Sequence, residues 1–270
     1  MGPAAAPSTF SVYPSTEKSF SDRVAQLAAR IDFRRADTDE EREAIFRLRY
    51  KAYLREGAIL ANSSGRFTDD DDEADNAYLM GLYVDGELAT SLRLHIASKE
   101  GNGHCPSLHV FRDILQPLLD ASKVLIDVTR FVADERLSRL HRGLPYVACR
   151  LPVLASEYFA ADLILAAVRV EHQAFYQRAF RHRLVCEPRA YPQLIKPISL
   201  MTLDFPSSAE WLYRRYPFFH SSQFERRQLF DRRQRPAPHS SRDSADSTQP
   251  SCSREPDNFF LEFRKALAAG

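Results

Sequence analysis

Two charged side chains interrupt an apolar stretch near the middle of the sequence. Asp127 and Arg130 would each cost several kcal/mol if buried without a partner, so both must be paired. Side chains alternate along a strand, so these two should point to opposite faces unless a bulge lies between them. Because bulges gather next to active sites, we predict that this strand lines a functional cleft. Its other residues are typical of a central strand buried on both faces: Val124, Leu125, Ile126, Val128, Phe131 and Val132.

Further arginines and carboxylates accompany this pair. Arg49 lies four residues after Ile45 on a predicted helix, at the margin of its buried face. Arg93 lies on the polar face of a predicted strand whose other face is apolar, and residues 69–75 form an acidic segment. Charges of both signs in one interior would compensate each other, and such clusters often mark sites with perturbed ionisation. The alternative is an ion-pair network that only holds the helix to the sheet.

The elements that must position these residues alternate between strands and helices. Thr38 followed by Glu41 is a capping box that starts a helix ending near Arg55, and the dipeptide at 85–86, Asp-Gly, is typical of a type I′ hairpin turn. The resulting order predicts a mixed α/β domain. Periodicity and turn signals predict strands at 31–35, 78–84, 88–96, 124–132, 163–170, 184–187 and 198–204, and further helices at 21–30, 107–119, 144–161 and 173–180.

The two ends differ from this body in composition. Residues 1–19 are rich in Ala, Pro and Ser, which predicts a disordered N-terminus. Residues 217–270 carry an arginine-rich run and then Ser, Pro, His and Asp, which predicts a low-complexity and largely disordered tail. The arginine run is either solvated or a site for an anionic partner. We therefore predict one folded domain at residues 20–216.

Overall composition argues against several classes of protein. The formal net charge of +1 disfavours a nucleic-acid-coating protein, and 44% hydrophobic residues suffice for a core. The four cysteines stand far apart without a C-x-x-C pair, so we expect a reduced protein with no disulfide framework and no metal site. No apolar run reaches the roughly 18 residues of a membrane span, and no signal peptide is evident. A cytoplasmic location is expected.

The order of elements and four motifs together resemble the GCN5-related N-acyltransferase fold. The likeness runs from about residue 33 to residue 205 and is strongest to the branch of N-acyl amino acid synthases and acyl-homoserine-lactone (autoinducer) synthases. It implies an α/β (α+β) fold with a mixed, twisted central sheet flanked by helices. The motifs are Leu48-Arg49 followed by Tyr53, the acidic loop with either Asp69 and Asp72 or Asp72 and Asp75, Ser91 to Arg93, and Asp127 to Phe131.

The resemblance also implies a reaction and roles for these residues. A fatty acyl group would move from a thioester to the amine of an amino acid or a similar acceptor. Asp127 would accept the amine proton, with Asp72 as the alternative, and Tyr176 would protonate the leaving thiolate, although Tyr176 can also be read as a core aromatic. Backbone N–H groups of the opened strand would hold the oxyanion. The acceptor would be bound by Arg49, Arg93, Arg130, Asp75 and Tyr53.

The phosphate-binding loop departs from the pattern of acetyl-CoA transferases. Pro145 removes a backbone N–H that such a loop needs for a pyrophosphate, which favours acyl carrier protein over coenzyme A as the thioester donor. A basic loop with Arg136, Arg139 and Arg142 is a plausible docking patch for an acidic carrier, with a solvated loop as the alternative. No bound cofactor is expected. Other possibilities are a lactone synthase, a generic acyl-CoA-dependent N-acetyltransferase and a non-catalytic acyl-binding module.

Overall fold

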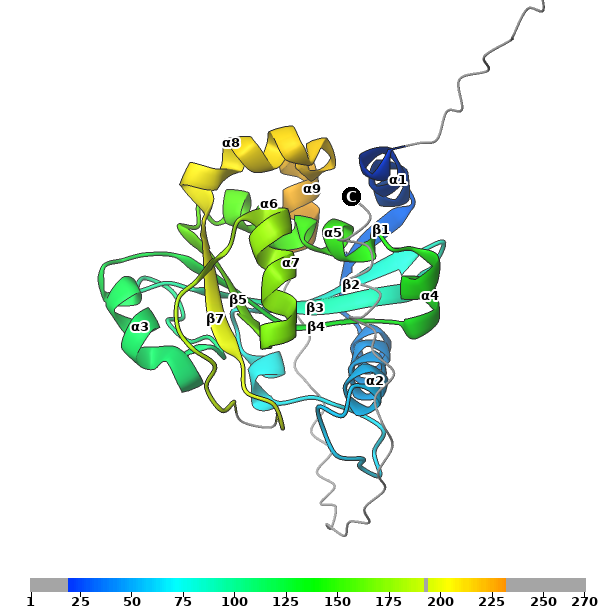
Figure 1. The fold of residues 1–270 in the computed structure, drawn as a ribbon, viewed down its shortest axis with the longest axis horizontal. Helices are drawn as coiled ribbons and strands as arrows, with labels where there is room; N and C mark the ends of the chain where they lie inside the picture. The colour runs from blue at the N-terminus through cyan, green and yellow to red at the C-terminus, as the bar shows by residue number, and fades with distance from the viewer. Residues whose placement is uncertain (1–18, 192–193, 232–270) are drawn as a thin grey trace, which may run out of the picture.

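The computed structural model describes residues 19–191 and 194–231. Its centre is one seven-stranded sheet with the order β1-β2-β3-β4-β5-β7-β6 (Figure 1). Within these residues β4 and β5 pair in parallel, and every other neighbouring pair is antiparallel. The strands are β1 Ile31–Arg35, β2 Ala77–Val84, β3 Glu87–Ala97, β4 Leu125–Ala133, β5 Leu163–Val168, β6 Arg183–Leu184 and β7 Ser199–Asp204.

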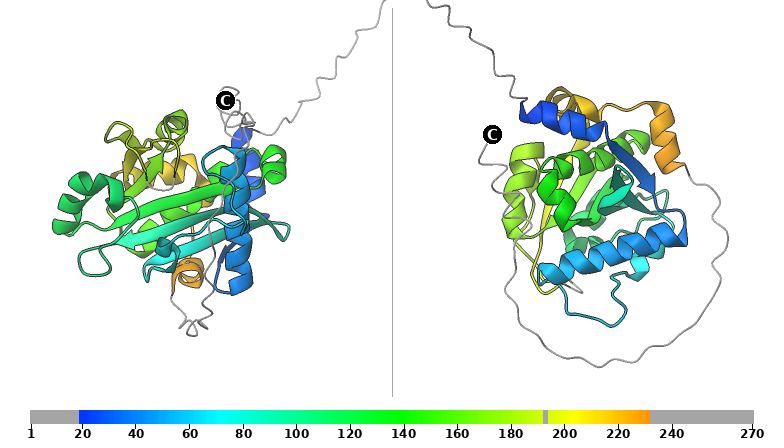
Figure 2. Two further views of the ribbon diagram at one scale, coloured as in Figure 1. Left: turned by 90° about the horizontal axis from the view of Figure 1, so that it is seen from below. Right: turned by 90° about the vertical axis from the view of Figure 1, so that its right-hand side faces the viewer.

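Helices cover both faces of this sheet. The end-on view in Figure 2 shows α2 on one side and α1 on the other. Together with α2, α3 packs on the face that carries Leu125 and Leu165, while α5, α6 and α9 pack on the face that carries Leu92 and Ile126. The helices are α1 Phe20–Ala28, α2 Asp39–Arg55, α3 Leu108–Asp120, α4 Glu135–Leu140, α5 Leu144–Ala148, α6 Arg150–Tyr158, α7 Val170–Phe180, α8 Phe205–Arg215 and α9 Gln223–Phe230, with 3₁₀ turns η1 Asp70–Glu73 and η2 Pro217–Phe219.

Local signals in the sequence explain several boundaries. Thr38 Oγ1 accepts from the backbone N–H of Glu41 at 3.2 Å, and the Glu41 carboxylate accepts from Thr38 N–H at 3.2 Å, so the predicted capping box forms. Asp85 and Gly86 both have positive φ, 50° and 87°, as a type I′ turn requires. The predicted helix at 144–161 is instead two helices, because the Pro152 ring has no N–H to donate to the fourth residue before it.

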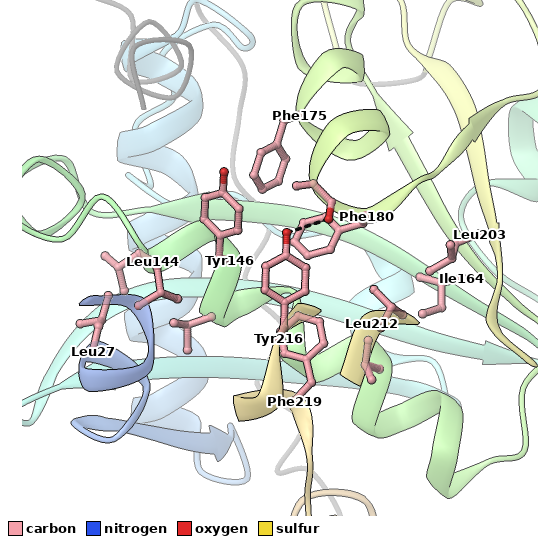
Figure 3. Packing of buried hydrophobic residues seen from close by; sticks show 14 of the residues in the cluster. Leu27, Leu144, Tyr146, Ile164, Phe175, Phe180, Leu203, Leu212, Tyr216 and Phe219 are labelled. Atoms are coloured by element: carbon pink, nitrogen blue, oxygen red, sulfur yellow. Dashed lines mark hydrogen bonds between the residues drawn. The ribbon is translucent and has the colours of Figure 1, made fainter. Parts of the chain in front are cut away.

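An aromatic cluster closes the core on the side of α5 to α8. Tyr146, Phe175, Phe180, Tyr216 and Phe219 pack edge-to-face, tilted or stacked, with neighbouring ring centroids 5.1–6.2 Å apart (Figure 3). The Tyr216 hydroxyl donates to the backbone carbonyl of Ala179 at 2.7 Å. Its polar end is therefore satisfied within an apolar core.

The described fold continues past residue 216, where the sequence predicted that the domain ends. Phe219, Leu229 and Phe230 are buried, and the carboxylate of Glu225 pairs with Arg150. The arginine-rich composition of this segment led to a prediction of disorder, but the segment contains a short helix that is capped by Ser222 and has a buried apolar side. The domain therefore includes residues 217–231. The rest of the predicted tail, and predicted disorder at residues 1–18, lie outside the described residues.

None of the helices in the described part combines the length and apolar character needed to cross a bilayer.

Candidate active site

A bulge in β4 decides where the charged residues of this strand point. Ser91 of β3 lies opposite Val132, but Arg93 lies opposite Thr129, so β4 holds one extra residue between them. Arg130 sits at this irregularity with a left-handed φ of 54°. Arg93 and Arg130 consequently both donate to the carboxylate of Asp69. The sequence left such a bulge open as the exception to regular alternation; the structure has one at Arg130, which turns this side chain toward the side of the sheet that carries Arg93.

Three arginines converge on two carboxylates of the acidic loop. Arg49 Nη1 lies 2.8 and 2.9 Å from the two carboxylate oxygens of Asp72, and Arg93 Nη1 lies 2.9 Å from one of them. Arg130 reaches Asp69, which Arg93 also contacts. All five side chains are almost completely buried. We call Arg49, Arg93, Arg130, Asp69 and Asp72 the arginine cluster; it joins α2, η1, β3 and β4.

The arginines keep both carboxylates of this cluster charged. Burial alone would raise the pKa of Asp72, but Arg49 and Arg93 hold it well below the usual range. Burial likewise opposes ionisation of Asp69, and Arg130 and Arg93 lower its pKa. Asp75 is exposed and lies outside the cluster, so the loop uses the spacing of Asp69 and Asp72. A carboxylate with a lowered pKa is a poor proton acceptor.

Asp127 occupies a different environment on the same face. It is fully buried, and it accepts hydrogen bonds from the backbone N–H of Ser107 at 2.9 Å and from the Ser107 hydroxyl at 2.8 Å. Burial raises the pKa of Asp127, and the two hydrogen bonds oppose that shift. Asp127 therefore anchors the residue that precedes α3. It is not among the residues that line the cleft described next.

A cleft opens where β4 and β5 separate. Their parallel pairing ends at Val128 and Ala166, and the following residues of both strands line the two walls. Without the next hydrogen bonds of the ladder, backbone groups of β4 just after Val128 are available to a ligand. Of the arginine cluster only Arg130 reaches this cleft. The other ionisable or phenolic side chains that line it are Tyr53, Glu56, Arg169, His172, Tyr176 and Lys196.

Glu56 is the cleft carboxylate that sequence reasoning missed. It follows the last residue of α2, and its carboxylate accepts from Arg169 Nη2 at 2.7 Å. Burial raises the pKa of Glu56, although Arg169 opposes the shift. The same Arg169 nitrogen lies 2.9 Å from His172 Nε2; burial and Arg169 lower the pKa of His172, which is therefore neutral and accepts this bond. No local motif marks Glu56, because Arg169 is 113 residues away in the sequence.

Tyr176 stands between the cleft and a second, apolar cavity. It lines both, as do Val128 and Phe131, and the remaining wall of the inner cavity includes Val153 and Leu212. Burial raises the pKa of Tyr176 well above its usual value, so the phenol keeps its proton at neutral pH. Tyr176 thus belongs to the wall between the polar cleft and the apolar cavity.

The basic loop has charged partners of its own. Arg136 pairs with Glu87, and Arg139 pairs with Glu135. Arg139 and Arg142 line a groove between this loop and α1, together with Arg23 and Arg30.

The glycine of this loop is covered by the N-terminal helix. A side chain added at Gly143 would meet Val24 at 3.0 Å and Leu27 at 3.3 Å, both on α1. The first turn of α5, which contains Pro145, begins directly after this glycine. On its side-chain side, Gly143 is therefore packed against α1.

A comparison with protein families adds to this geometry. A family model described as N-acyl amino acid synthase FeeM matches residues 44–204, which is more than half of the chain. The chain belongs to this family. It is therefore an N-acyltransferase, and the matched region holds the arginine cluster, Glu56, Asp127 and Tyr176. No curated protein matches the sequence.

Solved structures support the fold that the sequence predicted. The chain is similar to FeeM, an N-acyl amino acid synthase from uncultured soil microbes, with a TM-score of 0.56 and 18% identity over 67% of this chain and 94% of that one. Matches also include BjaI, a coenzyme A-dependent acyl-homoserine-lactone synthase (TM-score 0.48, 15% identity, 69% and 89% covered), and an acyl-CoA N-acyltransferase from Pseudomonas aeruginosa (0.43, 20%, 64% and 98%). The fold is the GNAT-like acyltransferase fold.

Proposed function

We propose that this N-acyltransferase moves a fatty acyl group from an acyl carrier protein thioester to the amine of an amino acid. The observation that carries the proposal is the cleft between β4 and β5, which has a cationic lining and borders a small apolar cavity. Arg130, Arg169 and Lys196 line the cleft, and Tyr176 stands where the apolar cavity meets it. An amino acid acceptor has a carboxylate for the cations. The apolar cavity is only about 20 Å³, so a fatty acyl chain would enter it by displacing the side chains that line it.

The reaction needs a neutral amine, a polarised thioester carbonyl and a protonated leaving thiol. The amine nitrogen attacks the carbonyl carbon, and backbone N–H groups of β4 near Val128 stabilise the oxyanion. The C–S bond then breaks, and Tyr176 donates its proton to the thiolate sulfur. The proton released by the amine passes to a carboxylate in the cleft and finally restores Tyr176 through solvent.

Glu56 is our candidate for that carboxylate. It lines the cleft and has a raised pKa, which suits a general base better than the lowered pKa of Asp72. Asp127, the proton acceptor expected from the sequence, accepts two hydrogen bonds from Ser107 and lies outside the cleft lining. Arg130 and Tyr53 fit a role in binding the acceptor. Arg49 and Arg93 fit a supporting role, since they hold the acidic loop.

The donor is inferred from the loop after β4. Pro145 in the first turn of α5 removes one backbone N–H that could bind a pyrophosphate. The groove lined by Arg139 and Arg142 provides positive charge for an acidic carrier protein instead.

Initial rates with matched acyl chains test the proposal. We expect acyl carrier protein thioesters to be far better donors than coenzyme A thioesters, and acceptors with a free carboxylate to be better than their amides. Mass spectrometry of the products, with S-adenosylmethionine in a parallel reaction, distinguishes an acyl amino acid from an acyl lactone. Equal or better rates with acetyl-CoA, or equal rates with amide acceptors, would contradict the respective half of the proposal.

A further inference from the structure

Three potential metal ligands meet beside the arginine cluster. Asp71 Oδ1 lies 2.8 Å from His104 Nε2 and 3.6 Å from His109 Nε2, and the three ligand atoms all lie within 4.8 Å of one another. We propose that Asp71, His104 and His109 form a binding site for one divalent transition-metal ion of the zinc class. This site is separate from the cleft and is independent of the proposed donor and acceptor. The sequence did not indicate it, because Asp71 is 33 residues away from His104.

The spacing of these atoms fits such an ion. Zinc bonds of about 2.0–2.1 Å at tetrahedral angles place neighbouring ligand atoms about 3.3 Å apart. The 2.8 Å and 3.6 Å separations bracket that value. Two imidazoles with one carboxylate are a ligand set that suits zinc and its neighbours in the first transition row rather than Mg²⁺ or Ca²⁺, which take oxygen ligands.

Neighbouring residues hold two of the ligands in place. His95 Nε2 donates to the backbone carbonyl of Asp71 at 2.9 Å. Asn76 Nδ2 donates to the backbone carbonyl of His104 at 2.7 Å, and His104 N–H donates to the Asn102 side chain at 3.0 Å. Such outer contacts orient the ligands of a metal site and reduce the cost of assembling it.

Solvent can reach the site while its other side is charged and buried. The side chains of Asp71, His104 and His109 are 17%, 37% and 50% exposed, which leaves room for water as a further ligand. The second oxygen of Asp71 lies 3.7 Å from Arg93 Nη2. Six of the seven residues at 69–75 are acidic, so an added cation is not repelled by the loop as a whole.

A bound ion would stabilise the loop that provides the two carboxylates of the arginine cluster. Asp71 belongs to η1, between Asp69 and Asp72, whereas His104 and His109 belong to the connection after β3 and the first turn of α3. The ion would join these two segments. Because it binds the folded state, it would raise the stability of the protein by an amount that grows with its concentration.

Titration of the full-length protein with Zn²⁺ after removal of metal by a chelator tests the site. Calorimetry should detect one equivalent of ion, the thermal midpoint should rise with Zn²⁺, and Co²⁺ should give visible absorption bands of a low-coordinate site. His104→Ala, His109→Ala and the isosteric Asp71→Asn should each weaken binding at least tenfold, as the loss of one of three ligands requires. His220→Ala, which removes an exposed imidazole elsewhere, should bind Zn²⁺ as the parent protein does.

The double variant His104→Ala/His109→Ala supplies the decisive comparison. It keeps all four cysteines, so zinc held by thiols would still bind to it. Equal binding by the parent and the double variant, or no rise of the thermal midpoint in the parent, would overturn the proposal. Equal stabilisation by Mg²⁺ would overturn the assignment to a transition metal. Circular dichroism of each metal-free variant verifies folding, and the half-exposed His109 gives a variant that removes no buried group.

Discussion

Glu56 and Asp127 are both buried carboxyl groups, but their surroundings leave them different chemistry. Two hydrogen bonds from Ser107 occupy Asp127, whereas Glu56 is held by Arg169 at the edge of the cleft. Burial raises the pKa of each. Only Glu56 lines the space in which an amine could approach. Their positions relative to the cleft, rather than their pKa values, therefore favour Glu56 over Asp127 as the general base.

We expect Glu56→Gln to lower kcat by about 10²-fold or more, as the loss of a general base does. The pKa of Glu56 is raised, so the rate in the parent enzyme should rise with pH as this group loses its proton above the usual glutamate range. That acidic limb of the pH–rate profile should disappear in the variant. Steady-state kinetics over a pH series measures both effects.

Two further variants make this test specific. Glu171→Gln removes another carboxylate that pairs with Arg169 but does not line the cleft, so it should keep kcat. Asp127→Asn should reduce stability more than kcat. The reverse pattern, a large loss of kcat in Asp127→Asn and little loss in Glu56→Gln, would return the base to the residue expected from the sequence.

At the scale of elements, the arginine cluster fixes η1 against α2, β3 and β4. Asp72→Asn leaves Arg49 and Arg93 buried with one charge less to pair, and breaking such a buried pair costs about 3–5 kcal/mol. Asp75→Asn, which is exposed in the same loop, should change stability by less than about 0.5 kcal/mol. Denaturant unfolding at pH 7 measures the two differences, and similar losses in both variants would contradict this account.

The arginine cluster also predicts how the free energy of unfolding depends on pH. The pKa of Asp69 and of Asp72 is lower in the folded state than in the unfolded chain. Their contribution is therefore complete above the ordinary aspartate pKa of about 3.9 and is lost as the pH falls toward the folded values. Asp72→Asn should accordingly lose less stability between pH 5 and 3 than the parent does, in the same denaturant experiments.

Helix α9 gives a second test at this scale, because it holds one buried and one exposed phenylalanine. Phe230 is 1% exposed against Tyr78, Tyr158 and Phe159, whereas Phe224 is 71% exposed. We expect Phe230→Ala to cost about 3–5 kcal/mol, and Phe224→Ala to have little effect. Thermal or denaturant unfolding of the two variants compares them. Equal stability would mean that the domain ends near residue 216, as composition suggested.

At the scale of the whole molecule, the sequence predicted the features that depend on local pattern. The capping box at Thr38, the turn at Gly86 and most strands follow from short spacings. The buried charges of Asp127 and Arg130 marked the strand in which the structure has a bulge. The motif resemblance then placed the three arginines in one interior. These inferences succeed because a buried charge or a left-handed turn leaves few alternatives.

What the sequence did not show depends on contacts between distant segments. Glu56 gains its environment from Arg169, and Asp71 gains its histidine neighbours from the connection after β3. Helix α9 was not predicted because it overlaps the start of an arginine-rich run, although its buried residues pack against α6. Pairing over such distances is set by the sheet order, which periodicity alone does not provide.

The groove between α1 and the loop after β4 is the proposed docking surface for the carrier protein. An acidic carrier would approach through long-range attraction to Arg139 and Arg142, so Arg139→Glu/Arg142→Glu should raise the KM for the carrier thioester and leave kcat nearly unchanged. Arg47→Glu/Lys51→Glu reverses the same number of charges on exposed residues of α2, on the opposite face of the sheet, and should alter KM little. Since exposed charges are screened by salt, the difference between the two variants should shrink as ionic strength rises. Rates at several carrier and salt concentrations measure this, and an equal effect of both variants would mean that the carrier docks elsewhere.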